Sequence, residues 1–456
     1  MMKNLRWCLC RTIGLVLSIV LLAAHPSFAQ EDPLTLNDCL QQAFRQSNLL
    51  RIADLSVQIA FEKTGAANAQ KLPSLNVNGA YTRIGKVTKF NIPMGPSGKR
   101  QEFSFGAPNR INMDVRAQMP VFTWGRISSS IAIAELGQKM STVQKQQQAR
   151  NVTDQVLRAF YAILLNKKVI ALDEHMITRA ESHLVVAERR FHSGHVPKLE
   201  LLRAQVQLKN AQGTLLEARD NLAKSQIYLA KMLGTTHHHL DVAGEFPHEP
   251  ITVTVEEVLS RAFQNRADLQ TIFLQQELGQ QSLMLAKSAD KLNLFVFSSY
   301  NIQNGFNPTE PNKLIDNWNV GAQLSIPLFD GFATRHKTQE AELELRSAHL
   351  REQELRRLIE MQIRQAVIAL GQMDAKIMMQ TENIQLAREV LAIAERQYLS
   401  GLASSLDVID AQQVLAQSEL LQTQAIFNHT MTKIELCKAM DDYRWFEKSL
   451  ENETGK

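Results

Sequence analysis

Two aspartates, Asp407 and Asp410, are the side chains best spaced to act together in this sequence. They lie three positions apart near the start of a predicted helix, so both carboxylates project from one helix face. Two carboxylates on one face attract cations, and several copies brought together would make a negatively charged constriction. Acidic residues in a first helical turn also cap the helix and complement its dipole, which is the structural alternative.

The rest of the sequence offers little further chemistry. Motifs for nucleophilic catalysis, phosphate loops and metalloproteases are absent, so we expect no enzyme, no catalytic residue and no cofactor. The adjacent histidines His237, His238 and His239 could hold a metal ion weakly. Histidines in a polar loop are more often simply solvated, so we predict no metal site.

The elements that must position the aspartates occur twice along the chain. The segment 186–194 returns as 393–401, with Ala-Glu-Arg and Ser-Gly in the same places, at an offset of 207 (393 − 186). Large apolar residues recur every seven positions in both copies, which is typical of supercoiled helices. They are Val156, Ile163, Ile170, Ile177, Leu184 and Phe191, then Ile363, Leu370, Ile377, Ile384, Leu391 and Tyr398. We therefore predict two repeats, residues 30–240 and 241–440, and a C-terminal tail over 441–456.

Each repeat is predicted to contain one β-hairpin and two long helices. The hairpins cover 74–121 and 292–328, where apolar and polar residues alternate as in strands with one apolar face. The long helices cover 126–192 and 197–233 in the first repeat, and 332–399 and 404–440 in the second. At about 1.5 Å per residue, the first of them spans roughly 100 Å. A single helix precedes each hairpin, over 35–71 and 254–289, and a loop is predicted over 85–108.

The first residues predict export from the cytoplasm. Basic residues precede an apolar run over 13–24, and Ser27-Phe-Ala29 fits a signal-peptidase site, so residues 1–29 are expected to be removed. No later run of 18 or more apolar residues is present. Removing three of 50 basic residues leaves 47 against 46 acidic ones, which gives no case for a nucleic-acid partner.

The two cysteines that follow the predicted signal segment allow two interpretations. An exported compartment is oxidising, so Cys39 and Cys437 could form a disulfide. Alternatively, both are buried small apolar residues.

The predicted strands require more than one chain. Each chain supplies four strands with an apolar face, and open strand edges are not tolerated in lipid. Four strands cannot close into a barrel, whereas three chains would supply 12 strands and six helical repeats. The expected fold is therefore a mixed α and β membrane protein assembled from several copies.

The order of these segments resembles that of the TolC-type outer-membrane efflux proteins. The most specific shared motifs are Pro-Leu-Phe-Asp-Gly over 327–331 and Tyr-Leu-Ser-Gly with Leu-Asp-Val-Ile-Asp-Ala-Gln over 398–412. The resemblance implies a homotrimeric exit duct, in which a 12-stranded outer-membrane β-barrel is continued by a long periplasmic α-helical barrel. It also implies a tripartite efflux or type I secretion system, with a periplasmic adaptor (membrane fusion) protein and an inner-membrane transporter as partners.

The resemblance implies roles for individual residues. Asp407 and Asp410 match the family's gate acids at the tunnel entrance. Tyr398 and Glu200 match residues of the network that holds the entrance closed, although Tyr398 could instead simply pack at the helix tip. An arginine of the best-studied members is replaced here by Ala403, for which Lys198 or Arg203 could substitute.

The helical turns match the family's adaptor-docking tip, which here contains Gly194, Gly401 and Leu402. The glycines also serve as ordinary helix stops, and both roles are compatible. A periplasmic coiled-coil adaptor or structural protein is the alternative function. It explains the seven-residue spacing and the signal segment, but not the four alternating strands. The exported substrate stays open between drugs, metals, proteins and polysaccharides.

Overall fold

The computed structural model describes residues 33–95, 98–104, 106–237, 239–247, 253–444 and 446. The predicted signal segment, residues 1–29, lies outside this part of the chain, as does most of the predicted tail. The helices are α2 (Leu36–Gln46), α3 (Asn48–Ala69), α4 (Arg126–His192), α5 (Lys198–Leu233), α6 (Val255–Asn265), α7 (Ala267–Lys287), α8 (Ala333–Ser400) and α9 (Ser405–Met440). The strands are β1 (Ser74–Arg83), β2 (Lys89–Met94), β3 (Lys99–Ser104), β4 (Asn109–Phe122), β5 (Asn293–Gln303) and β6 (Ile315–Ser325).

The four long helices are confirmed almost residue for residue. The helix predicted over 126–192 is α4, with 67 residues, and its counterpart α8 has 68. Two shorter predictions were wrong, because each single helix is in fact a pair. Ser47 caps α3 by accepting a hydrogen bond from the amide of Leu50, and the extended backbone of Arg266 separates α6 from α7.

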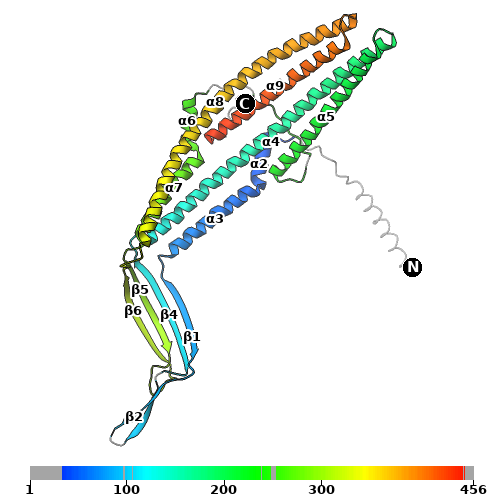
Figure 1. Ribbon diagram of the computed structural model, residues 1–456. Coiled ribbons are helices and arrows are strands. Elements are labelled where there is room, and N and C mark those ends of the chain that lie inside the picture. The colour runs from blue at the N-terminus through cyan, green and yellow to red at the C-terminus, as the bar shows by residue number, and fades with distance from the viewer. Residues whose placement is uncertain are drawn as a thin grey trace, which may run out of the picture. The chain divides into compact units, whose positions relative to one another are not determined.

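Strands β1, β4, β5 and β6 form one antiparallel sheet in that order (Figure 1). Its register confirms the predicted alternation. One cross-strand row contains Val77, Val115, Tyr300 and Trp318, and the adjacent row contains Asn76, Arg116, Ser299 and Asn319. The sheet therefore has an apolar face and a polar face.

The predicted loop over 85–108 is not irregular throughout. Strands β2 and β3 form a separate two-stranded sheet inside it, in which Lys89 and Glu102 make an ion pair of 2.7 Å. Pro93 lies in β2 opposite Arg100, which is possible because a two-stranded sheet consists only of edge strands.

The described chain divides into two compact units. The turn unit contains Val156–Phe246, Asn383–Gln424 and the described residues up to Arg45, and the sheet unit contains the remainder. Each unit takes residues from both predicted repeats. The repeat boundaries therefore remain a sequence-based prediction.

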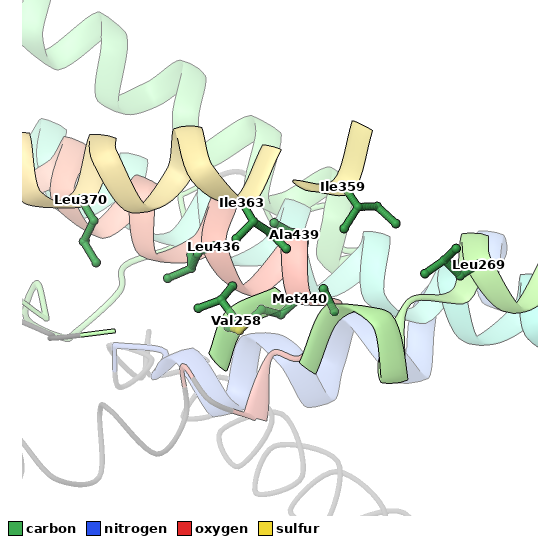
Figure 2. Packing of buried hydrophobic residues seen from close by; sticks show 9 residues of the cluster. Val258, Leu269, Ile359, Ile363, Leu370, Leu436, Ala439 and Met440 are labelled. Atoms are coloured by element: carbon green, nitrogen blue, oxygen red, sulfur yellow. The ribbon is translucent and has the colours of Figure 1, made fainter. Parts of the chain in front are cut away.

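In the sheet unit, short helices pack on long ones through a hydrophobic cluster (Figure 2). Its buried members are Val258 and Ala262 of α6, Leu269 of α7, Ile359, Ile363 and Leu370 of α8, and Leu436, Ala439 and Met440 of α9. Ile363 and Leu370 belong to the predicted seven-residue stripe, so this stripe supplies core contacts as expected. In the part of the chain that the structure describes, no helix has both the length and the hydropathy that crossing a bilayer requires.

Of the two interpretations of Cys39 and Cys437, the disulfide is not formed. Cys39 and Cys437 are both free thiols and both are buried, so the alternative of two buried small residues holds. Burial raises the pKa of the Cys39 thiol to about 12 and also raises the pKa of Cys437. Both groups are therefore protonated at neutral pH.

Candidate functional site at the two helical turns

The turn unit contains two helical turns of the same construction. Gly194 and Gly401 adopt left-handed backbone conformations, with φ of 76° and 80°. The amide of the next residue donates back into the helix, His195 to the carbonyl of Arg190 at 2.9 Å and Leu402 to that of Gln397 at 2.8 Å. This pattern ends a helix at a glycine without leaving its last carbonyls unpaired. The internal repetition is thus preserved in the backbone hydrogen bonds.

Arg190 of α4 links the two turns. Its guanidinium carbon lies 4.6 Å from the centroid of the Tyr398 ring, and its Nη1 donates to the Tyr398 carbonyl. A Cβ at Gly401 would lie 3.6 Å from Arg190 Nη2, an ordinary van der Waals contact, so the positive φ and not the space for Arg190 is what favours glycine there. Sequence reasoning missed Arg190, although the repeat contained a signal. The second copy has the neutral Gln397 at the equivalent position, so the arginine is specific to one copy.

Tyr398 is buried and reaches Glu200, as the resemblance implies. Its hydroxyl lies 3.5 Å from Glu200 Oε2, at the limit of a hydrogen bond. Burial raises the pKa of the Tyr398 phenol, and the charge of Glu200 raises it further. The phenol therefore stays protonated and acts as the donor. Its role in closing an entrance remains a prediction.

His183 is a second residue that sequence reasoning missed. Its side chain is buried, its Nε2 lies 2.8 Å from Ser405 Oγ, and its ring centroid lies 5.2 Å from that of Tyr398. Burial lowers the pKa of the His183 imidazole, so the ring is neutral near pH 7. The second copy has Val390 at the equivalent position, and this exchange of an apolar for a titratable residue was the available signal.

A partly buried ion pair connects α4 to α9 in the same unit. Glu419 is 12% exposed, and its two oxygens lie 3.1 Å from Arg179 and 3.5 Å from Arg388. The Arg179 carbonyl also accepts a hydrogen bond from Gln412 at 3.5 Å. These contacts hold α4, α8 and α9 together below the turns.

Asp407 and Asp410 differ in their surroundings. Asp407 Oδ2 accepts hydrogen bonds from the Ser404 amide at 2.7 Å and the Ser404 hydroxyl at 2.8 Å, and these bonds lower the pKa of its carboxyl. The predicted capping role is therefore confirmed for Asp407. Asp410 is exposed and has no hydrogen bond or ion pair within the described residues. Both side chains are exposed on the first turns of α9, so capping leaves the charge of Asp407 facing solvent.

A family model described as "Outer membrane efflux protein" matches residues 39–235 and 258–440. The chain belongs to the outer membrane efflux protein family. As a member, it is an outer-membrane protein that extends into the periplasm, and its family consists of channel proteins rather than enzymes. The alternative of a periplasmic coiled-coil adaptor or structural protein is not favoured.

Individual relatives of this outer membrane efflux protein are distant in sequence. The alkaline protease secretion protein AprF of Pseudomonas aeruginosa is 23% identical over 314 residues, which cover 66% of this chain and 64% of AprF. Outer membrane protein TolC of Vibrio cholerae is 20% identical over 391 residues, 84% of each protein. The crystal structure of the outer membrane protein VceC of Vibrio cholerae has a TM-score of 0.74 at 17% identity, and the match covers 89% of this chain and 96% of VceC. The helix-rich mixed fold is therefore that of the outer-membrane efflux channels.

The turns of this efflux protein present apolar side chains to solvent. Leu402 is 81% exposed, and Leu399 before it and Leu199 and Leu202 at the start of α5 are also exposed. Ala403 is followed directly by the Ser404 cap, and the guanidinium at Tyr398 comes from Arg190 rather than from Lys198 or Arg203. His237 and His239 lie in the loop after α5, and His238 is outside the described residues.

The buried His183 predicts a pH-dependent stability. The folded pKa lies below the ordinary value of about 6.5, so the unfolded chain takes up a proton first as pH falls. The contribution of neutral His183 to the free energy of unfolding is therefore fully present above the ordinary pKa. It is lost as the pH falls from there towards the lowered pKa of the folded protein. His183→Gln should remove this part of the pH dependence of thermal unfolding, followed by circular dichroism.

The exposed His192 of the same helix supplies the control. His192→Gln should unfold with the same pH dependence as the unchanged protein. If His183→Gln also behaves like the unchanged protein, His183 does not carry the effect.

Proposed function

We propose that this chain is the outer-membrane exit duct of a tripartite efflux or type I secretion system. It would passively conduct substrates delivered by an inner-membrane transporter and a periplasmic adaptor. The observation that carries the proposal is a sheet with one exposed apolar face whose strands lead directly into long helices. β4 ends at Phe122 and α4 begins at Arg126, and the same order recurs from β6 to α8.

We propose a homotrimer for a physical reason. Strands β1 and β6 are the edges of the four-stranded sheet and lack a second neighbour within the described chain. Unpaired backbone groups are costly in lipid, and three copies of this sheet would supply a closed barrel of 12 strands. The apolar face fits contact with lipid, since Val77, Trp318 and Val320 are 67%, 71% and 69% exposed.

The two repeats would then contribute the same kinds of elements to the assembly. Residues 30–240 and 241–440 each supply one hairpin to the barrel and two long helices to a helical tunnel. Exposed leucines on α8, including Leu343 and Leu350 at seven-residue spacing, support packing against a neighbouring copy.

We propose that the turn unit forms the entrance of the duct. Asp407 and Asp410 would make acidic rings around it, and Tyr398 with Glu200 would hold it closed. Arg190 supplies the guanidinium that Ala403 cannot, by stacking on Tyr398 and bonding to its carbonyl. The turns at Gly194, Gly401 and Leu402 would dock the adaptor through the exposed leucines.

A pair of lysine substitutions tests the assembly. Val320 lies on the apolar face of β6 and Asn319 on the polar face. Val320→Lys should abolish membrane assembly, because lysine at the lipid-facing midplane of a barrel costs about 2–4 kcal/mol. Asn319→Lys should leave assembly intact. The measurement is the mass of the detergent-solubilised complex, expected at three chains for the unchanged protein and Asn319→Lys, and a stable inserted monomer would refute the trimer.

Asparagine substitutions test the gate. Asparagine keeps a side-chain carbonyl oxygen that can accept from Ser404, so Asp407→Asn with Asp410→Asn removes both charges and leaves the acceptor for the Ser404 amide in place. The double variant should show a several-fold lower preference for cations and weaker block by multivalent cations in planar bilayers. Asp220→Asn, on the exposed face of α5, is the control and should change neither property. Unchanged selectivity in the double variant would leave these acids as helix-start residues only.

A further inference from the structure

The polar face of the four-stranded sheet carries positive charge that the proposed gate does not use. The register places Arg110, Asp114 and Arg116 of β4 on this face, so it has two cations for one anion per chain. Neither arginine has a carboxylate within ion-pair distance among the described residues. Asp114 instead accepts a hydrogen bond from Asn78 Nδ2 at 3.1 Å. The charge of both arginines is therefore not neutralised within the chain.

Arg116 lies against an aromatic ring on the same face. Its guanidinium carbon is 5.0 Å from the centroid of Phe297 of β5, and its Nε is buried without a hydrogen-bond partner. On the next strand, Gly321 leaves the space that the ring occupies, because a Cβ there would lie 2.8 Å from Phe297 Cζ. Three strands thus build one stack, and a larger residue at position 321 would displace it.

Arg110 repeats this arrangement further along β4. Its guanidinium carbon is 5.7 Å from the centroid of Phe306. The neighbouring Asn304 is buried and bonds to both sides of the β4 backbone, donating to the Asn109 carbonyl at 2.8 Å and accepting from the Ile111 amide at 2.8 Å. Each arginine of the polar face therefore lies beside a phenylalanine ring, Arg116 beside Phe297 within β5 and Arg110 beside Phe306 just beyond the end of β5.

Stacking explains what these arginines can bind. A guanidinium stacked on a ring can still donate from the edge formed by its two Nη groups, and that edge matches the two oxygens of a carboxylate or sulfonate. Phe295 lies on the same face as Phe297, opposite Pro120 of β4, and adds apolar surface beside the charge.

We infer that the Arg116–Phe297 stack on the polar face of the sheet is a binding step for anionic substrates with an aromatic or other apolar body. The inference rests on the proposed function, which makes this face the lining of the duct. Arg116 would bind the anionic group, and Phe297 with Phe295 would contact the apolar body. Arg110 adds a second positive charge along the same strand.

Block of single-channel current tests the inference. Naphthalene trisulfonate is the anionic aromatic probe, and inorganic sulfate is the anion without a ring. Arg116→Gln should weaken block by the trisulfonate about tenfold, equivalent to about 1.4 kcal/mol. Phe297→Leu should weaken block by the trisulfonate but not by sulfate. Arg100→Gln, exposed in β3 outside the four-stranded sheet, should change neither.

Equal block of Arg116→Gln and the unchanged protein by the trisulfonate overturns the inference. If Arg116→Gln forms no channels, Arg116→Lys replaces it. Lysine keeps the charge but not the planar edge, so block by the trisulfonate should weaken there too, and unchanged block again overturns the site.

One result would contradict the proposed function rather than the binding site. If the unchanged protein conducts no current, the duct proposal fails, and binding is measured instead by trisulfonate fluorescence in detergent. Weaker binding by Phe297→Leu than by Arg100→Gln would still support the site, and equal binding would refute it.

Discussion

The open edges of β1 and β6 are the constraint on which the proposed architecture depends. Every backbone N–H and C=O group in the hydrocarbon of a membrane must find a partner within the protein. A four-stranded sheet pairs the backbone groups of its two inner strands only. One chain therefore leaves the outer backbone groups of β1 and β6 without partners in the sheet. Repetition doubles the strands within a chain, and in the proposed trimer assembly would complete the ring. The helical part of that trimer would then have the same threefold symmetry.

The long helices could be predicted because their signal is local and repeated. The range 126–192 contains no proline and includes the seven-residue stripe. Together they predict α4 with the bounds that the structure has. The breaks at Ser47 and Arg266 were not predicted, for different reasons. Ser47 caps α3 through a hydrogen bond from the nearby Leu50 amide. A serine at this position allows such a cap but does not by itself predict it. Arg266 instead donates hydrogen bonds to Gln362 of α8 and to the Ala439 carbonyl of α9, which are far away in the sequence. It also pairs with the nearby Asp268.

The candidate site was predictable in part. Tyr398 and Glu200 were expected to meet, and they do. Arg190 and His183 were overlooked because their partners lie on a different helix, which one stretch of sequence does not reveal. Both occur where the two copies differ, as arginine against Gln397 and histidine against Val390. In a chain built from two repeats, the positions at which the copies differ identify side chains whose contacts occur in one copy only.

The two buried thiols have a practical consequence. Cys39 and Cys437 are inaccessible, and their raised pKa values keep them in the unreactive thiol form. A maleimide added to the folded protein would therefore find no native target among the described residues. Among the described residues, a cysteine introduced on an exposed strand or turn would be the single reactive thiol, so spin labels and fluorophores can be attached there without replacing Cys39 or Cys437.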